Sequence, residues 1–186
     1  HVHLLEMTCF ESNLKGEVTY LKDFEIGRSI IGISAISGNT MALVARDRAN
    51  IDYIYFLECQ TPPHDWYVSI TWKTDEKLSS VHLSDDSLLL YTLSESRLSC
   101  YVPDPFEGIL QRRWTMDLAH GEKYCTAIPN TGAMIALGSS SGIVTVYLSG
   151  GTRAWSTDLS STITTLAFSN SGDFLAVGCS TGDLYI

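Results

Sequence analysis

The sequence predicts an all-β fold built from a repeated unit of about 42 residues. A similar motif occurs three times, as WKTD at 72–75, WTMDL at 114–118 and WSTDL at 155–159, and its tryptophans lie 42 and 41 residues apart. Residues 126–146 also align without a gap with residues 166–186, at an offset of 40 and with seven identities. No apolar pattern of helical period persists for three turns. Recurrence at a fixed period indicates one structural unit made several times.

The two aligned segments divide into the same elements in the same order. Each begins with an alternating apolar strand, continues through a polar turn into an almost wholly apolar strand, and passes through a Ser/Gly turn into a third strand. The predicted strands are 125–128, 134–137 and 143–147 in the first segment and 164–168, 174–177 and 184–186 in the second. The apolar middle strand indicates burial on both faces, and short strands between turn signals favour an antiparallel arrangement.

Glycines are prominent among the conserved positions of the repeat. Three of the seven identities are glycine pairs: Gly132 with Gly172, Gly138 with Gly178, and Gly142 with Gly182. Glycine recurs where the backbone needs a positive φ or a close approach, so we expect both copies to make the same turns. The segment from Gly138 to Gly142 also matches G-x-S-x-G, the nucleophile elbow of α/β-hydrolases, but that elbow requires a strand followed by a helix. Here it lies between two predicted strands, which indicates a hairpin turn.

Two earlier units are more degenerate copies. Their predicted strands are 81–83, 88–91 and 98–101 in one unit, and 31–36, 41–44 and 53–56 in the other. The tryptophan motifs then fall at the end of the fourth, outer strand of a unit. Four short strands in a unit of this length are typical of a β-propeller blade. The expected blades are 1–28 (partial), 29–73, 74–115, 116–157 and 158–186 (partial).

Residues 1–186 are therefore expected to form a single, incomplete β-propeller of four-stranded antiparallel blades, with about four blades present. Residues 1–5 align with a third strand. Exposed sheet edges invite aggregation, and two arrangements protect them. In one, the strand at 17–24 completes the blade begun at 158–186 and closes a four-bladed ring. In the other, which we expect, the chain is part of a larger propeller.

The composition excludes several classes of partner. The formal net charge is −9, and the 12 Lys and Arg residues form no cluster, so we expect no direct nucleic-acid binding, which needs grouped cations. No apolar run reaches the roughly 18 to 20 residues that cross a bilayer, so we expect no membrane span. The five cysteines are odd in number and include no C-x-x-C pair. This pattern favours reduced, buried thiols in the cytoplasm or nucleus.

The stretch SNSGDFLAVGCSTGDLYI, at 169–186, resembles a blade of the WD-repeat propellers in its S-x-x-G turn, its L-A-x-G strand and its final Gly-Asp-Leu turn. Two features depart from that family. The Trp-Asp pair that usually ends the third strand is replaced by Tyr147-Leu148 and its counterparts, and the Gly-His pair before the first strand is missing. The segment SGGTRAWSTDL, at 149–159, is instead similar to repeats of quinoprotein-like propellers.

The WD-repeat resemblance implies a non-catalytic interaction scaffold, a subunit of a multiprotein complex that binds other proteins and needs no cofactor. Two alternatives stay open. One is a quinoprotein-like propeller enzyme, which bound-quinone absorbance would reveal. The other is a propeller that reads a peptide tail in its central channel, as a ubiquitin-ligase substrate receptor does. An aromatic or acidic cluster at the channel mouth would favour it.

Two loops are candidate partner-binding sites because they are longer than their counterparts, and insertions on repeat scaffolds often bind. Their candidate residues are Arg46, Arg48, His64, Asp65 and Trp66. The tryptophan motifs could line a ligand cavity, but packing between blades explains a tryptophan in each blade better, with each Asp in a turn. These structural positions are Trp72, Asp75, Trp114, Asp117, Trp155 and Asp158. We expect no catalytic or metal-binding residues, since His1 and His3 have no nearby Cys or Asp to complete a metal site.

Overall fold

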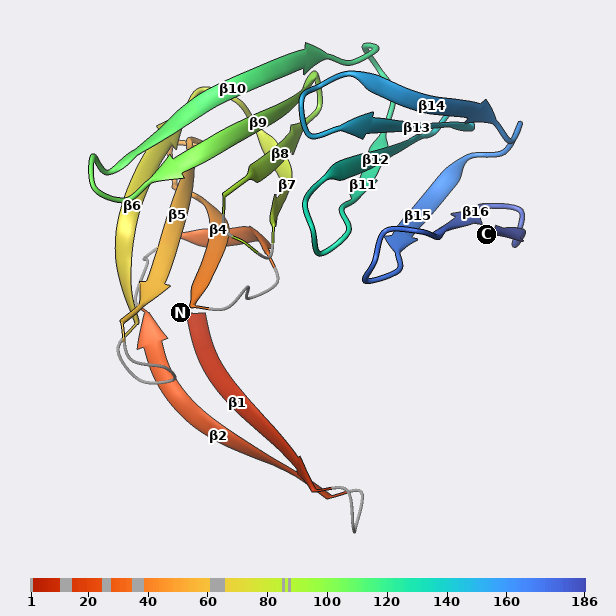
Figure 1. The fold of residues 1–186 in the computed structure, drawn as a ribbon. Coiled ribbons are helices and arrows are strands. Elements are labelled where there is room, and N and C mark those ends of the chain that lie inside the picture. The colour runs from red at the N-terminus through yellow and green to blue at the C-terminus, as the bar shows by residue number, and fades with distance from the viewer. Residues whose placement is uncertain are drawn as a thin grey trace.

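The structure is a computed structural model of the chain, and it describes residues 2–10, 15–24, 28–34, 39–60, 66–84, 86 and 88–186. Every regular element in these residues is a β-strand, which confirms the predicted all-β class. The strands form five antiparallel sheets that follow one another along the chain (Figure 1). Since no helix occurs in this part of the chain, none there is long and apolar enough to cross a membrane.

Four of the sheets are propeller blades, which we number I to IV. Blade I consists of β3 (Ser29–Ile33), β4 (Thr40–Arg46), β5 (Asp52–Cys59) and β6 (Trp66–Thr74). Blade II consists of β7 (Leu78–Leu83), β8 (Leu90–Ser94), β9 (Arg97–Asp104) and β10 (Ile109–Asp117). Blade III consists of β11 (Tyr124–Ala127), β12 (Met134–Ser139), β13 (Ile143–Leu148) and β14 (Arg153–Asp158). Blade IV has the three strands β15 (Ile163–Phe168), β16 (Leu175–Cys179) and β17 (Leu184–Tyr185).

Within each blade the strands pair in chain order, and successive blades lie along an arc (Figure 1). The first strand of one blade packs against the inner strands of its neighbour: β7 lies against β3 and β4, and β15 lies against β11 and β12. This side-by-side packing of four-stranded meanders is the propeller arrangement that the repeat predicts.

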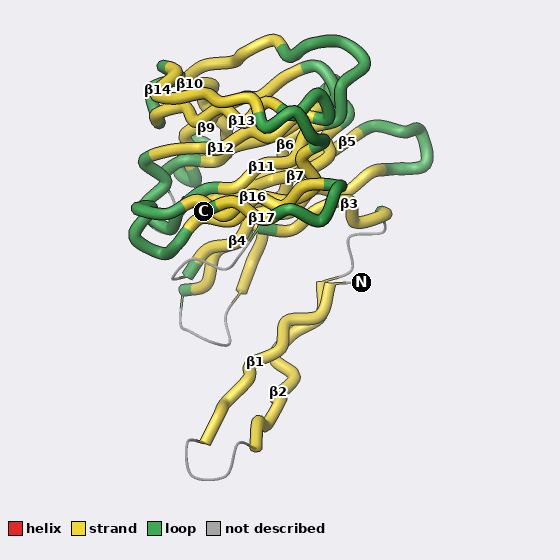
Figure 2. Tube along the Cα trace, turned by 90° about the vertical axis from the view of Figure 1, so that its right-hand side faces the viewer, coloured by secondary structure: helices red, strands yellow, loops and turns green. Residues whose placement is uncertain are grey.

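The fifth sheet is a hairpin of β1 (Val2–Phe10) and β2 (Lys15–Phe24). Figures 1 and 2 show that it extends away from the four blades. Its two strands cover the segments for which the sequence predicts a third strand and a fourth strand. Membership of a larger propeller remains a prediction.

The hydrophobic core consists of layers between the blades, because the second strand of a blade is buried on both faces. In β4, Ala42 and Val44 face blade II, whereas Met41, Leu43 and Ala45 pack on the opposite side of blade I. All five residues of β8 are buried, as expected of a middle strand, but the strand begins at Leu90, and Leu88 of the predicted strand 88–91 is 61% exposed. A blade buries its apolar faces only by stacking on a neighbour, so hydrophobic burial holds the arc together.

Close packing between blades explains one of the repeated glycines. A β-carbon at Gly138 would lie 2.5 Å from Cγ2 of Ile163 on the first strand of blade IV. The nearby Gly142 is a glycine for a different reason, its positive φ. Its φ is 97° in the turn between β12 and β13, and its N–H donates to the Ser139 carbonyl at 3.2 Å. The G-x-S-x-G segment is therefore a hairpin turn, as the sequence predicts.

The blades present two different ends. One end carries the connections between blades and the turns between second and third strands, and we call it the entry face because the chain enters each first strand there. The other end carries the turns after the first and third strands, and we call it the far face. The antiparallel order of the strands places every loop of the blades on one of these two faces.

Candidate interaction site

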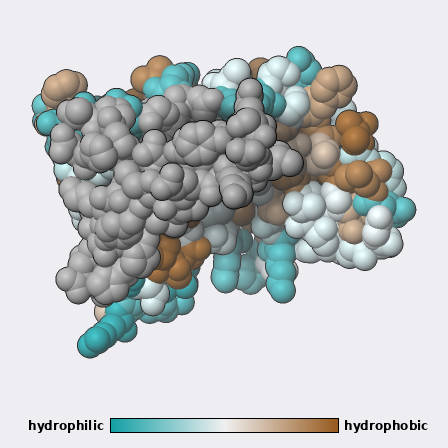
Figure 3. Space-filling view, turned by 90° about the horizontal axis from the view of Figure 1, so that it is seen from below, coloured by the Kyte–Doolittle hydropathy of each residue, from teal (hydrophilic) through white to brown (hydrophobic). Residues whose placement is uncertain are grey.

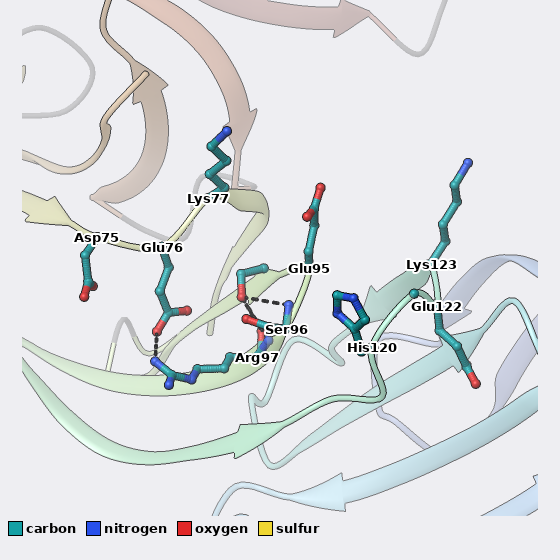
Figure 4. Close-up of a pocket in the computed structure, with 11 residues that line it drawn as sticks. Asp75, Glu76, Lys77, Glu95, Ser96, Arg97, His120, Glu122 and Lys123 are labelled. Atoms are coloured by element: carbon teal, nitrogen blue, oxygen red, sulfur yellow. Dashed lines mark hydrogen bonds and ion pairs between the residues drawn. The ribbon is translucent and has the colours of Figure 1, made fainter. Parts of the chain in front are cut away.

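A charged groove of about 610 Å³ opens on the entry face (Figure 4). Three segments line it: the connection between blades I and II at 75–77, the β8–β9 turn at 94–97, and the connection between blades II and III at 120–123. Each segment follows or joins strands of the rigid blades. The groove is thus assembled from loops that are far apart in sequence but held by packed sheets.

Arg97 organises one wall of the groove. Its Nη1 lies 3.1 Å from Glu76 Oε1, and its Nε lies 3.2 Å from Asp117 Oδ1. The hydrogen bonds from the guanidinium to Glu76 and Asp117 raise the pKa of Arg97 above its usual value. The backbone N–H of Arg97 also donates to Ser94 Oγ at 2.9 Å, which fixes the turn that carries it. One side chain therefore ties the blade I–II connection to the outer strand of blade II.

Other charged side chains of the groove extend toward solvent. Figure 4 shows Lys77, Glu95 and Lys123 reaching from three different segments toward the same side, with His120 between Glu95 and Glu122. Cations and carboxylates thus alternate along the opening. Such a pattern matches a complementary charged polypeptide better than a small ion of one sign, since charge pairing across an interface selects a partner and its register.

Arg46 has a structural role at the start of its candidate loop, and its contact with a partner stays a prediction. It is the last residue of β4, and its Nε and Nη2 lie 2.6 and 2.8 Å from the two carboxylate oxygens of Asp52. Burial raises the pKa of Asp52, but the hydrogen bonds from Arg46 and from the Leu78 N–H outweigh burial and leave it below its usual value. Arg46 Nη2 also lies 3.3 Å from the Leu78 carbonyl oxygen, so the pair joins blade I to blade II.

The other candidate loop residues divide between buried, exposed and undescribed positions. Trp66 is wrongly placed in a loop by the sequence: it begins β6, and its side chain is 5% exposed in the core of blade I. Arg48 is exposed beyond β4 on the entry face. His64 and Asp65 lie outside the described residues. Arg46, Arg48 and Trp66 do not line the charged groove.

The three repeat tryptophans lie on the fourth strands of their blades but differ in environment. Trp72 packs against the core between blades I and II. Trp114 donates from Nε1 to the Ser149 carbonyl of blade III at 2.8 Å, and its ring lies over Gly151. Trp155 is 49% exposed, and the neighbouring sheet of blade IV has three strands. Trp155 borders an apolar cavity of about 630 Å³ between blades III and IV.

The repeat aspartates lie on the entry face, where the tryptophan motifs end. Asp158 Oδ1 accepts a hydrogen bond from the Ser160 N–H at 2.7 Å, within the turn between blades. Asp117 instead pairs with Arg97, and Asp75 is exposed at the edge of the groove. Only Asp158 has the turn hydrogen bond that the sequence leads us to expect.

No group of three or more His, Cys, Asp or Glu side chains converges as a metal site in the part of the chain with described side chains. His1 and the side chain of His3 lie outside that part. The thiols of Cys59, Cys100, Cys125 and Cys179 are free.

Sequence reasoning missed the groove because its residues come from three separate connections. Glu76, Arg97 and Asp117 are ordinary surface charges when considered one at a time. The available signal was their position: Glu76 follows one tryptophan motif directly, and Asp117 is the aspartate of the next. Once the motifs are placed at the ends of fourth strands, these charges must gather on one face.

Comparisons with known proteins agree with the fold. The sequence model of the anaphase-promoting complex subunit 4 WD40 domain family matches residues 124–186. Raptor of Chaetomium thermophilum is similar in structure, with a TM-score of 0.65 and 18% identity, over 85% of this chain and 15% of that chain. The Cps50 (Swd1) β-propeller domain of Myceliophteria thermophila has a TM-score of 0.64 and 10% identity, over 95% of this chain and 60% of that chain.

The chain thus spans only part of the length of either solved protein. No curated protein shows significant sequence similarity to it. At these identities the solved structures establish the fold alone. The solved structures show an all-β propeller fold for this chain, and its residues 124–186 are similar to a WD40 domain family.

Proposed function

We propose that this chain is a non-catalytic interaction scaffold, a propeller subunit of a multiprotein complex, and that a protein partner docks in the charged groove. The observation that carries this proposal is the construction of the groove. Its loops stand on buried sheets, Arg97 fixes one wall through Glu76 and Asp117, and further charges extend into solvent. A rigid frame with solvent-facing charges is suited to recognising a complementary surface.

Two further features support a scaffold. The matching sequence family is named for a subunit of a complex. The acidic charge and the scattered cations of the chain are suited to protein partners and unsuited to nucleic acid. We place the protein in the cytoplasm or nucleus, where thiols such as buried Cys59, Cys100 and Cys179 stay reduced.

Affinity purification of the full-length protein with quantitative mass spectrometry tests the proposal. The triple variant Lys77→Glu, Glu95→Lys, Lys123→Glu reverses three groove charges. We expect wild type to recover a stoichiometric partner and the triple variant to lose it, with an unchanged melting temperature. Arg153→Glu, a charge reversal at the far-face end of β14, is the matched control and should retain the partner. Equal recovery by the triple variant and wild type would refute docking in the groove.

A further inference from the structure

The two faces of the blades differ in the side chains that they expose. Thirteen large hydrophobic side chains are exposed among the described residues. Eight of them lie at the far-face ends of strands or in far-face turns: Ile33, Tyr67, Val68, Leu88, Phe106, Ile109, Leu148 and Phe174. In Figure 3, hydrophobic residues are also visible at the right-hand end, where Figure 1 shows blade IV. The far face is thus the more apolar of the two.

Phe106 is the extreme case, because its side chain is 100% exposed. It lies in the four-residue turn 105–108 that joins β9 to β10, next to the last paired residues, Asp104 and Ile109. A phenyl ring buried by nothing in its own fold adds no hydrophobic stabilisation to that fold. The ring is available in full to another molecule.

The turn that carries Phe106 is held in one conformation. Asp104 Oδ1 accepts the Glu107 N–H at 3.1 Å, and Asp104 Oδ2 accepts Gln111 Nε2 at 3.2 Å. Prolines at 103 and 105 fix their φ angles, and Gly108 takes a φ of 67°. A preorganised anchor loses little conformational entropy on binding, and a buried aromatic anchor is a common source of binding energy at interfaces.

The charge of the far face selects the partner. In the described residues of the turns on this face the charged side chains are the three carboxylates Asp86, Glu107 and Asp173, and one cation, Arg153, lies at the far-face end of β14. Glu107 lies directly beside Phe106. An apolar anchor within an acidic surface is complementary to an apolar pocket bordered by Lys or Arg. Anionic lipid and nucleic acid would instead be repelled by these carboxylates.

We propose that the far face is a second docking surface, on which Phe106 inserts into an apolar pocket of a protein partner and Glu107 pairs with a Lys or Arg at the rim of that pocket. This surface deepens the proposed scaffold function, since a scaffold must hold at least two partners. It does not depend on the charged groove, which opens on the opposite face.

Site-specific crosslinking in cells identifies the occupant. A benzoylphenylalanine placed at position 106 of the full-length protein should crosslink to a protein segment with apolar residues and neighbouring Lys or Arg. The same group at position 143, where Ile143 is 44% exposed on the entry face, should not give that product. Crosslinks confined to the chain itself, to a second copy, to lipid or to an acidic segment would each overturn the proposal.

Binding to the purified partner then measures the anchor. Phe106→Ala should weaken binding at least tenfold, and Glu107→Lys should weaken it in a way that a Lys→Glu or Arg→Glu change at the partner's rim restores. Ile143→Ala is the control and should leave binding unchanged. The groove triple variant should retain this interaction, so failure of the groove proposal and failure of this one are distinguishable. Unaltered binding by Phe106→Ala would refute the anchor, since an exposed side chain can be removed without unfolding the protein.

Discussion

Arg46 and Asp52 form a two-point ion pair across the turn between β4 and β5, at 2.6 and 2.8 Å. Asp52 is 1% exposed, and its Oδ2 also accepts the Leu78 N–H at 2.7 Å. One buried carboxylate therefore satisfies a cation of blade I and a backbone donor of blade II. The two blades are joined here by a polar contact in addition to their shared apolar core.

Asp52→Ala should destabilise the protein by about 3 to 5 kcal/mol, since it leaves a partly buried guanidinium and a buried N–H without their acceptor. Urea unfolding followed by tryptophan fluorescence measures the loss. Arg97→Ala is the comparison variant: its side chain is 43% exposed and that of its partner Asp117 is 87% exposed, and exposed ion pairs contribute little to stability. Comparable losses of unfolding free energy for the two variants would show that burial does not determine how much these ion pairs stabilise the protein.

Trp114→Phe should cost about 1 kcal/mol, because it removes the Nε1 donor to the Ser149 carbonyl and keeps most of the ring. Trp155→Phe should change the free energy of unfolding much less, since Trp155 is 49% exposed. Chemical denaturation of the two variants gives the comparison. If Trp155→Phe were the more costly change, the role of Trp114 in joining blades II and III would be wrong.

The fold could be predicted because its causes recur along the chain. The turn at Gly142 needs a positive φ, and the close approach of Ile163 to Gly138 leaves no room for a side chain. The same two requirements recur 40 residues later at Gly182 and Gly178, so glycine recurs in the sequence at this spacing. The buried second strands likewise recur in the sequence as apolar runs.

The candidate loop residues could not be placed in the same way because their contacts do not recur along the chain. The sequence puts Arg46 in a loop, but its partner Asp52 is within reach only when β4 and β5 pair. Trp66 follows a proline-rich segment, yet the β5–β6 register places it opposite Cys59 in the core. Such contacts depend on register, which loop length does not reveal.

Gly132→Ala and Gly182→Ala separate backbone strain from close packing. Each glycine has a positive φ, of 63° and 92°, so an alanine at either position costs about 1 to 2 kcal/mol in backbone conformation. At Gly132 a β-carbon would also overlap the side chain of Ser84 in blade II, whereas nothing lies within 4 Å at Gly182. Gly132→Ala should therefore lower the melting temperature further, and equal shifts would contradict close packing of the blade III turn on blade II.

His82 should make the stability of the blade II–III interface depend on pH. Its Nε2 lies 2.7 Å from Thr126 Oγ1, which is 3.3 Å from Ser80 Oγ, and these two hydroxyls carry no charge to stabilise an imidazolium. Burial lowers the pKa of His82 below its usual value. As pH falls below about 6.5, the unfolded chain therefore takes up a proton before the folded chain does, and the free energy of unfolding decreases until the lower folded pKa is passed.

Urea unfolding of wild type and His82→Gln between pH 8 and pH 5 tests this: the stability advantage of wild type should be constant above about pH 7 and shrink below it. An advantage of wild type that stays constant or grows toward pH 5 would mean that the folded protein accommodates a charged His82.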